Sequence, residues 1–334
     1  MTQSAPSLTI LDVGHGSCTI LTNGARTTLI DTGPGAAVLE YLLQEEISVI
    51  DVIVLSHADE DHIRGLIALL GTEEFGVRRI QLNSDAAKTS EAWQNLAYEV
   101  DELRRVGLVT LEVQLREGDM IDSGIAGLEL RVLAPRDRLI MRGPGSRDRD
   151  GRRITSNSIS AVILVRYADR RVALITGDLD EVGLVHLVET NLSLAADVLV
   201  FPHHGGLAGG NGPAATAFAR KLTSAVDPEC IAISLGRGRY ANPRPEIVEG
   251  MRQAASSARI ACTQLSKDCA SNLPSLEPAH LLPLFAGGAE SRSCCAGTMR
   301  IELEEGSALL PDAAAHGAFI DVAAPTTALC RRRI

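Results

Sequence analysis

Apolar residues in the first third of the chain follow two different periods. Short runs of aliphatic and β-branched residues, several of them separated by glycine-containing turns, are typical of strands. Longer stretches with apolar residues at three- and four-residue spacing are typical of helices. The predicted strands span residues 8–11, 18–21, 27–30 and 49–55, and the predicted helices span residues 37–47, 61–71 and 89–107.

The rest of the chain repeats this order of strands followed by helices. The predicted strands span residues 108–115, 128–133, 159–167, 171–175, 198–201, 231–235, 258–265 and 298–303, and the predicted helices lie near 180–191, 214–224 and 245–257. This order predicts an α/β (α+β) fold in which two sheets pack face to face with helices outside. We interpret residues 136–153 as an inserted loop and expect the tail after residue 305 to be weakly structured.

The chain has 334 residues, of which 45% are hydrophobic, enough for one large domain or two ordinary ones. We expect a hydrolase core in residues 1–260 and a cysteine-rich part in residues 261–334 that completes the same domain. No basic segment followed by an apolar stretch occurs near the N-terminus, and no apolar run reaches the roughly 18 residues of a membrane helix. We therefore expect a cytoplasmic protein.

The formal net charge of −10 means that the surface as a whole should repel nucleic acid. Any binding of nucleic acid would need a local cationic patch, and the inserted loop carries seven arginines against three aspartates. A solvated loop without a partner is the alternative. Four of these arginines are candidate substrate-binding residues: Arg147, Arg149, Arg152 and Arg153.

Five of the seven cysteines fall in the last quarter of the chain, at positions Cys262, Cys269, Cys294, Cys295 and Cys330. In a cytosolic protein this clustering favours a metal site or buried thiols over disulfides. One interpretation is a structural Zn²⁺ that fixes the C-terminal extension to the core. The other is a set of buried thiols without metal, because no CxxC pair is present.

The segment VLSHADEDHIRG places ligand-type side chains where a predicted buried strand passes into a helix. His57 and Asp59 alternate in extended backbone and can face one side, while Asp61 and His62 fall in the first helical turn. The carboxylates would repel one another without cations, so the cluster predicts bound divalent metal, and imidazole with carboxylate oxygen suits Zn²⁺ or Mn²⁺. The helix N-terminus also favours an anion at this point.

Two later strand ends repeat this pattern of an apolar run followed by ligand-type residues beside glycine. Asp178 ends VALITGD, and His203 and His204 follow the strand in VLVFPHHGG. Polar residues at the ends of three predicted strands are expected to meet at one edge of the fold.

Five motifs, in this order, resemble those of the metallo-β-lactamase superfamily: DVGHGS (12–17), LIDTG (29–33), SHADEDH (56–62), TGD (176–178) and FPHHGG (201–206). They are most similar to the branch that includes the hydrolase domain of ComEC-type DNA-uptake proteins, here as a stand-alone form. The resemblance covers residues 8–265 and implies an αββα sandwich with a dinuclear site in a cleft at one edge.

Position by position, the resemblance implies ligands for two ions: His57 and Asp59 for one, Asp61, His62 and His203 for the other, with Asp178 bridging them. Asp59 and Asn157 stand where most of the superfamily has histidine, which weakens the first position and favours Mn²⁺ over Zn²⁺ there. Whether one or two ions are bound is open at this point. Asn157 is also a candidate substrate contact.

The resemblance further implies hydrolysis by a metal-activated hydroxide that attacks a phosphorus or carbonyl centre. Asp61 is the candidate for orienting this nucleophile. His204, beside a ligand, is the candidate general acid.

Other polar residues of the motifs have simpler interpretations. Asp12 and Asp31 adjoin glycines and are expected to form turns or to support ligands. His15 is most simply a histidine on a surface turn, with a substrate contact as the alternative. Asp178 could cap the helix that follows it, and His186 is expected to be a surface or packing residue.

We therefore predict a metal-dependent hydrolase, most simply a phosphodiesterase or nuclease that acts on DNA with help from the arginine loop. Hydrolysis of a small ester, a lactone or a cyclic nucleotide is the alternative, because one fold of this kind supports several reactions. A non-catalytic, metal-bearing accessory subunit is a third hypothesis. Protein partners in DNA uptake or in defence against foreign DNA would fit the first.

Overall fold

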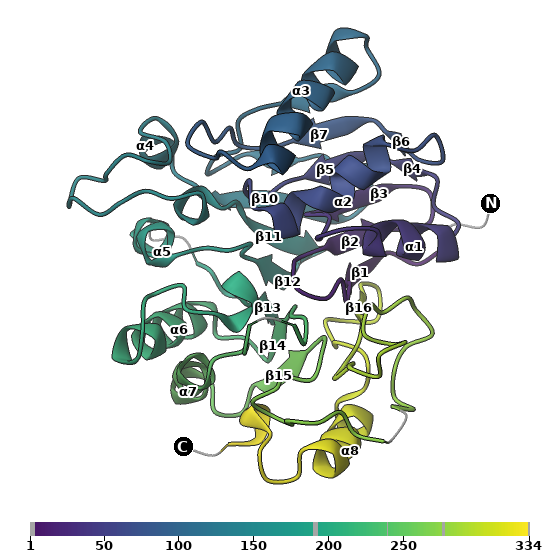
Figure 1. The fold of residues 1–334 in the computed structure, drawn as a ribbon, viewed down its shortest axis with the longest axis vertical. Helices are drawn as coiled ribbons and strands as arrows, with labels where there is room; N and C mark the ends of the chain where they lie inside the picture. The colour runs from purple at the N-terminus through teal and green to yellow at the C-terminus, as the bar shows by residue number, and fades with distance from the viewer. Residues whose placement is uncertain (1–3, 190–192, 239, 276–277, 333–334) are drawn as a thin grey trace.

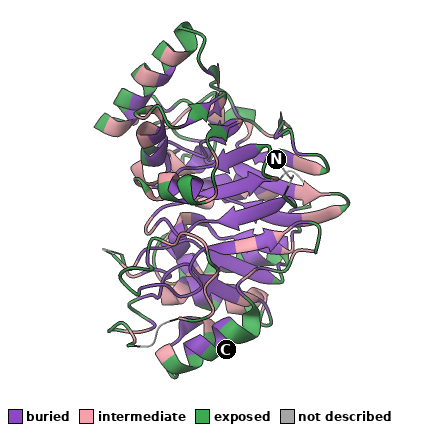
Figure 2. Ribbon diagram, turned by 90° about the vertical axis from the view of Figure 1, so that its right-hand side faces the viewer, coloured by how far each residue is buried: buried purple, intermediate pink, exposed green. Residues whose placement is uncertain are grey.

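Two seven-stranded sheets pack face to face in the computed structural model, which describes residues 4–189, 193–238, 240–275 and 278–332. Helices cover the outer face of each sheet (Figure 1). The predicted α/β sandwich of two mixed sheets with helices outside is thus confirmed. The strands are almost wholly buried, and exposed residues are concentrated on the helices and loops (Figure 2).

The first sheet has the strand order β16-β1-β2-β3-β5-β7-β8. Its strands β16, β1, β2 and β3 are antiparallel, and β3, β5, β7 and β8 run parallel. The bounds are β1 (Ser7–Ile10), β2 (Thr19–Thr22), β3 (Thr27–Ile30), β5 (Val52–Val54), β7 (Arg79–Gln81), β8 (Thr110–Glu112) and β16 (Met299–Glu302), beside a small pair of β4 (Val49–Ile50) and β6 (Gly76–Val77). The covering helices are α1 (Ala37–Gln44), α2 (Glu60–Leu70) and α3 (Glu91–Arg105).

The second sheet has the order β15-β14-β13-β12-β11-β10-β9, antiparallel from β9 to β12 and parallel from β12 to β15. Its strands are β9 (Met120–Ile121), β10 (Leu128–Ala134), β11 (Val162–Tyr167), β12 (Arg170–Ile175), β13 (Val198–Val200), β14 (Cys230–Ile233) and β15 (Arg259–Cys262). The helices of this half are α4 (Asp137–Ile140), α5 (Glu181–Val188), α6 (Pro213–Val226), α7 (Pro245–Ala254) and α8 (Ala313–Ala323), with 3₁₀ turns η1 (Asn157–Ile159), η2 (Pro202–Gly205) and η3 (Leu329–Arg331).

The alternation of side chains along each strand divides the apolar residues into three layers. In β5, Val52 and Val54 join the cluster between the two sheets, whereas Ile53 and Leu55 join the cluster beneath α1, α2 and α3. The third cluster lies between the second sheet and α5, α6 and α7. The apolar runs of the sequence therefore form fully buried strands, because both faces of each sheet are covered.

The tail after residue 305 contains a helix, so the expectation of weak structure was wrong. The side chain of Asp312 accepts hydrogen bonds from Ala314 N and Ala315 N and caps α8, whose alanines have high helix propensity. Phe319 and Ile320 bury against the second sheet. None of the helices among the described residues combines the length and apolar character that a membrane span requires.

Candidate metal centre

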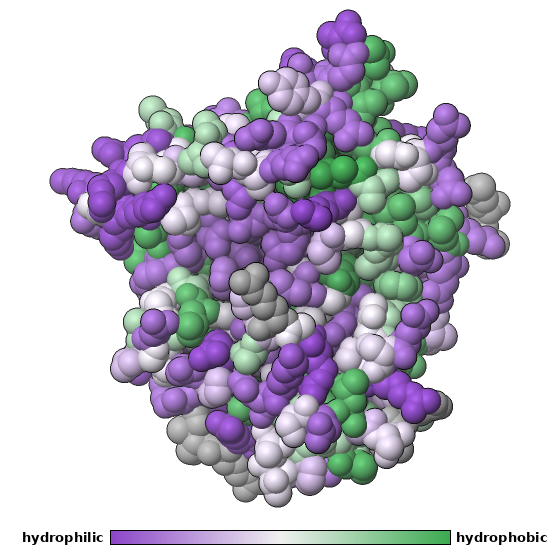
Figure 3. Space-filling model, in the orientation of Figure 1, coloured by the Kyte–Doolittle hydropathy of each residue, from purple (hydrophilic) through white to green (hydrophobic). Residues whose placement is uncertain are grey.

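The loops that follow β1, β3, β5, β12 and β13 meet in the middle of one face, where they bring the ligand-type residues together. Hydrophilic side chains fill the middle of this face, between the helices of the first sheet and those of the second (Figure 3). A cavity of about 400 Å³ lies here. The described residues that line it are His15, Asp59, Asp61, Asp178, His203, His204, Gly206, Leu207, Tyr240, Ala241, Asn242 and Arg244.

Two glycines allow the backbones to approach closely enough to form the centre. Gly177 has φ +50°, and a Cβ there would lie 2.3 Å from Ser160 Oγ, the atom that accepts a hydrogen bond from Asp178 N. Gly65 of α2 packs on the loop after β3, where a Cβ would lie 1.9 Å from Thr32 O. Larger residues at these positions would displace Asp178 and the first turn of α2.

A hydrogen-bond chain fixes the orientation of two buried imidazoles. The Asp31 carboxylate accepts from Ser56 Oγ at 2.8 Å and from His62 Nδ1 at 2.7 Å. Ser56 Oγ also lies 2.9 Å from His57 Nδ1. Because the serine proton is donated to Asp31, its oxygen accepts from His57, so both imidazoles carry their proton on Nδ1. The sequence reading of Asp31 as a support for ligands agrees with this arrangement.

The opposite nitrogens of these two rings lack hydrogen-bond partners among the described residues. His57 Nε2 and His62 Nε2 are both buried, and they lie 3.8 and 3.2 Å from carboxylate oxygens of Asp178. Ligand atoms of these three residues all lie within 4.8 Å of one another. Buried nitrogens without a partner are costly, and two of them facing one carboxylate form a donor set that fits a divalent cation.

A second group forms from His15, Asp61 and His204, whose ligand atoms also lie within 4.8 Å of one another. His204 Nδ1 donates to Ser234 O at 3.0 Å, which leaves the lone pair of Nε2 facing Asp61 Oδ2 at 3.1 Å and Asp178 Oδ1 at 3.6 Å. A nitrogen lone pair that faces two carboxylates is repulsive unless a proton or a metal ion lies between them. The donor set of this group therefore also fits a metal ion.

His15 belongs to this centre, so its reading as a surface-turn residue was wrong. Its ring centroid lies 4.6 Å from that of His204 and 4.8 Å from that of Tyr240. Burial and the neighbouring His204 lower the pKa of His15 to about 4, so its ring is neutral near pH 7 and its nitrogen can accept or bind metal. Its glycine neighbours in the sequence gave no sign of this position.

His203 differs from His204 in exposure and contacts. Its side chain is 37% exposed, against 5% for His204, and its Nδ1 lies 3.0 Å from Asp178 Oδ2 and 3.3 Å from Asn157 Nδ2. Both histidines have φ +54°. Left-handed backbone at a residue other than glycine costs about 1–3 kcal/mol and is characteristic of functional sites. Asn157 thus lies beside the centre through its contact with His203.

The carboxylates give the centre a strong preference for positive charge. Burial alone would raise the pKa of Asp178, but His204 and His62 hold it well below its usual range. Burial alone would lower the pKa of His62, yet Asp31 and Asp178 raise it well above the ordinary value. Protons and divalent ions therefore compete for this position.

Asp59 is engaged differently from the other acidic residues. Its Oδ1 lies 2.6 Å from Lys88 Nζ and 3.8 Å from His57 Nε2. Lys88 comes from the loop before α3, and its ammonium supplies a positive charge beside Asp59. Nothing in the sequence pattern singled out Lys88, because its proximity depends on how the loop folds back.

The remaining motif residues have structural contacts. Asp180, not Asp178, caps α5, since its Oδ1 accepts from Gly183 N. Asp12 accepts from Gly14 N and Gly288 N and so ties the loop after β1 to the C-terminal segment. His186 is buried and lies 3.7 Å from Asp148, consistent with a packing role.

The arginine loop lies outside the cavity lining. Arg147, Arg149 and Arg153 are exposed, while Arg152 pairs with Asp148 at 2.7 Å and with Asp150 at 2.8 Å. Part of the positive charge of the loop is therefore compensated within it.

The C-terminal cysteines are all reduced. Cys262, Cys269, Cys295 and Cys330 line one small cavity, whereas the Cys294 thiol donates to Asp12. In the part of the chain that the structure describes, no three ligand atoms of this set lie within 4.8 Å of one another. Burial raises the pKa of the Cys330 thiol to about 11, which keeps it protonated near pH 7.

A model of the metallo-beta-lactamase superfamily matches residues 11–221. A search of curated proteins found no significant match. Three solved structures are similar to this chain. The metallo-beta-lactamase fold protein YhfI from Bacillus subtilis has 11% sequence identity and a TM-score of 0.47, and the match covers 79% of this chain and 98% of YhfI. The metallo hydrolase Igni18 from Ignicoccus hospitalis has 15% identity and a TM-score of 0.42, with 77% of this chain and 94% of Igni18 covered, and the metal-dependent hydrolase Tm1679 has 16% identity and a TM-score of 0.49, with 77% of this chain and 95% of Tm1679 covered.

Proposed function

The chain belongs to the metallo-beta-lactamase superfamily, and from this premise we propose that it is a metal-dependent phosphodiesterase that acts on DNA. The observation that carries the proposal is the pair of buried nitrogens, His57 Nε2 and His62 Nε2, which face Asp178 without hydrogen-bond partners among the described residues. A superfamily site that had lost its metal would have no reason to keep these nitrogens oriented by Ser56 and Asp31.

The residues present fit a divalent ion at two neighbouring groups. His57, His62 and Asp178 would hold an ion, and Asp61, His204 and His15 would approach it or a second ion. Asp178 Oδ1 lies 3.6 Å from His204 Nε2 of the second group. When bound, such ions supply Lewis acidity and make water acidic enough to serve as a nucleophile near neutral pH. Asp61 lies in the cavity with its carboxylate 3.1 Å from His204, where it can orient that water.

We assign the two adjacent histidines the reverse of the roles expected from sequence. His204 is buried and its Nδ1 is committed to Ser234 O, so its Nε2 suits a metal. His203 is partly exposed to the cavity, and its hydrogen bond with Asp178 raises its pKa. A histidine that keeps its proton near neutral pH suits the donation of that proton to the leaving oxygen.

The contact between Lys88 and Asp59 supports one ion over two. We propose that one ion binds strongly and that the Lys88 ammonium takes the place of a second positive charge beside Asp59. A second ion ligated by Asp59, as the superfamily resemblance implies, would require Asp59 to release Lys88. Manganese or zinc both suit a donor set of nitrogen and oxygen. A separate structural Zn²⁺ at the C-terminal cysteines remains a prediction.

An anionic substrate is supported by Arg244, which lines the same cavity as Asp61 and Asp178. Its Nε is buried without a hydrogen-bond partner among the described residues, and its nearest carboxylate, Glu246, is 4.0 Å away. A guanidinium here favours a phosphodiester over an uncharged ester or lactone. The exposed Arg147, Arg149 and Arg153 would extend contact along the DNA backbone, as would suit a ComEC-like nuclease.

The test uses purified protein with linear double-stranded DNA, single-stranded DNA and bis(p-nitrophenyl) phosphate in the presence of Mn²⁺ or Zn²⁺. We expect metal-dependent cleavage by the parent protein and none by the Asp61→Ala and His62→Ala variants. Turnover of an ester or lactone with all phosphodiesters left intact would overturn the substrate assignment. Tight metal binding without turnover of any substrate would favour the accessory-subunit hypothesis.

A further inference from the structure

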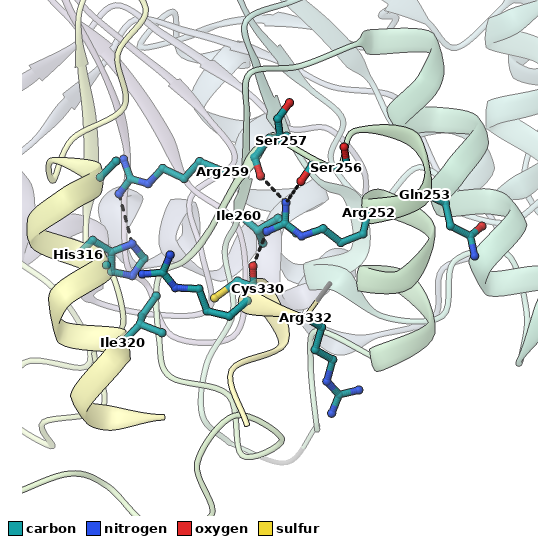
Figure 4. A pocket seen from close by; sticks show the side chains of 14 residues that line it. Arg252, Gln253, Ser256, Ser257, Arg259, Ile260, His316, Ile320, Cys330 and Arg332 are labelled. Atoms are coloured by element: carbon teal, nitrogen blue, oxygen red, sulfur yellow. Dashed lines mark hydrogen bonds between the residues drawn. The ribbon is translucent and has the colours of Figure 1, made fainter. Parts of the chain in front are cut away.

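A second cavity, of about 970 Å³, lies between α7, the start of β15, α8 and η3 (Figure 4). We call it the arginine cavity because four arginines line it. The described lining residues are Arg252, Gln253, Ser256, Ser257, Ala258, Arg259, Ile260, Ala313, His316, Gly317, Ile320, Cys330, Arg331 and Arg332.

The arginine cavity is separate from the candidate metal centre. Strands β13, β14 and β15 are parallel, and the metal centre forms where β13 and β14 end, at His204 and Ser234. Arg259, in contrast, is the first residue of β15. The two sites therefore lie at opposite ends of the same strands, and none of the described residues lines both cavities.

Arg252 is held in the wall of the cavity by backbone oxygens. Its Nη1 donates to Ser256 O at 3.1 Å and to Ala258 O at 2.6 Å, and its Nη2 donates to Cys330 O. The side chain reaches from α7 toward Cys330 (Figure 4). These contacts fix the guanidinium but do not neutralise it, and two of its five donors are left for another acceptor.

Arg259 is held in the same way from the other side. It donates to Leu309 O at 2.5 Å and to Pro311 O at 2.7 Å, and its Nη2 lies 3.3 Å from His316 Nδ1 (Figure 4). Its Nε is buried and lacks a hydrogen-bond partner among the described residues. Two oriented guanidiniums thus border one cavity with donors to spare.

None of the described residues that line the cavity is acidic, and neither Arg252 nor Arg259 forms an ion pair with a carboxylate of the described residues. Arg300 is also partly buried, but it pairs with Glu45 at 2.9 Å. Arg331 has the exposed Asp321 at 3.3 Å. Burial, together with the positive charges of Arg259 and Arg331, lowers the pKa of His316 to about 3. Partly buried cations without counter-ions are costly, which an anionic ligand would offset.

We propose that the arginine cavity binds a phosphorylated small molecule of nucleotide size. The phosphates would lie against Arg252, Arg259 and Arg331, where bidentate contacts to phosphate oxygens are strong. The apolar part of the ligand would lie on Ile260 and Ile320. The volume of the cavity is within the range of small-molecule sites. This inference is independent of the proposed hydrolase activity.

The test is calorimetric titration of the full chain with ADP, pyrophosphate and adenosine, in the presence of a chelator so that the metal centre cannot bind the phosphates. We expect ADP to bind more tightly than pyrophosphate and adenosine not to bind. Arg331→Glu and Ser257→Asp should weaken ADP binding by about tenfold or more, since each places a carboxylate in the lining without removing a buried contact. Arg104→Glu on α3, with the same change of charge, should bind like the parent.

Three results would overturn the proposal. The first is that neither ADP nor pyrophosphate binds at millimolar concentration. The second is that Arg104→Glu weakens ADP binding as much as Arg331→Glu does. The third is that ADP and pyrophosphate bind with equal affinity, which would show that the cavity does not recognise the nucleoside. Circular dichroism of each variant separates loss of binding from loss of fold.

Discussion

The two ends of the parallel strands β13, β14 and β15 have opposite electrostatic character. Where β13 and β14 end, carboxylates from Asp61 and Asp178 gather with imidazoles whose lone pairs face them. Where β15 begins, guanidiniums gather, and neither Arg252 nor Arg259 pairs with a carboxylate of the described residues. At both ends backbone or buried polar groups fix the charged side chains in place.

This contrast shows that a cluster of fixed charges of one sign indicates a ligand of the opposite sign. A surface charge is solvated by water, but a buried or half-buried charge needs a partner, either another group of the protein or a bound ligand. Fixed carboxylates with free imidazole nitrogens match a metal cation, and fixed guanidiniums with free donors match an anion. The predictions below test each end separately, beginning with the largest expected effect.

Replacing Asp178, whose carboxylate lies beside imidazoles of both groups of the metal centre, should have the largest effect. Asp178→Asn removes the negative charge that faces His57, His62 and His204, so we expect phosphodiester cleavage to fall by about 10³-fold or more, with loss of bound metal. Activity and metal content of the purified variant are the measurements.

Asp180→Asn is the matched control, since Asp180 caps α5 two residues later. It should keep metal and activity and lose at most about 1 kcal/mol of stability. A fully active Asp178→Asn protein would show that the anionic end is not a metal centre.

Asp31→Asn should weaken metal binding without removing a ligand. The change takes away the acceptor that fixes His62 Nδ1, and loss of such a partner typically costs about 10–100-fold in metal affinity. Competition with a chromogenic chelator measures the affinity, and unchanged affinity would argue that the Asp31–Ser56 chain only supports the fold.

Lys88→Met should increase the number of ions at the anionic end. Without the ammonium, Asp59 becomes available to a second ion, so we expect the metal content to rise from about one toward two per chain. Elemental analysis after dialysis against Mn²⁺ gives the count. Lys221→Met, on α6, is the control, and two ions in the parent protein would contradict the role given to Lys88.

The exposed loop arginines should affect DNA binding more than catalysis. Changing Arg147, Arg149 and Arg153 together to Ala should weaken DNA binding and lower the slope of log affinity against log salt by about 3 if each contacts a phosphate. Fluorescence anisotropy at several salt concentrations measures this. Arg152 is left intact because it pairs with Asp148. If Arg331→Glu weakened DNA binding equally, the result would indicate that DNA binds at the arginine cavity instead.

A pH dependence of stability is expected from His316 at the cationic end. Its pKa in the folded chain is about 3, below the ordinary 6.5, so the unfolded chain binds the extra proton. The free energy of unfolding should therefore fall as the pH drops from 6.5 toward 3, by up to about 1.4 kcal/mol per pH unit from this residue. Urea unfolding of the parent and of His316→Gln at several pH values gives the difference, and identical pH profiles would contradict the assignment.

The sequence predicted the sandwich because both faces of each sheet are covered, which leaves long apolar runs between glycine turns. It also indicated residues of the centre, since Asp61 and His62 lie in the first turn of the helix after β5 and Asp178 lies just beyond β12. It did not place Lys88, His15 or Tyr240, which reach the cavity from loops whose paths depend on tertiary packing. The roles of His203 and His204 depend on left-handed backbone at both residues, which no spacing rule reveals.

The C-terminal half was harder to predict for a different reason. An alanine-rich tail was read as weakly structured, whereas capping by Asp312 and burial of Phe319 make it helical. Arg252 and Arg259 are far from any motif, and only the folded chain shows that backbone oxygens hold them at one cavity.

The pairing of β1 with β16 has a consequence for synthesis on the ribosome. Ser7 to Ile10 pair with Met299 to Glu302, so one edge of β1 stays without its neighbour until residues 299–302 have been translated. During that interval the exposed backbone groups of β1 could recruit strands of other nascent chains. Cells that make this protein rapidly should therefore depend on holding chaperones, and shortening the chain before β16 should favour aggregation over a smaller folded product.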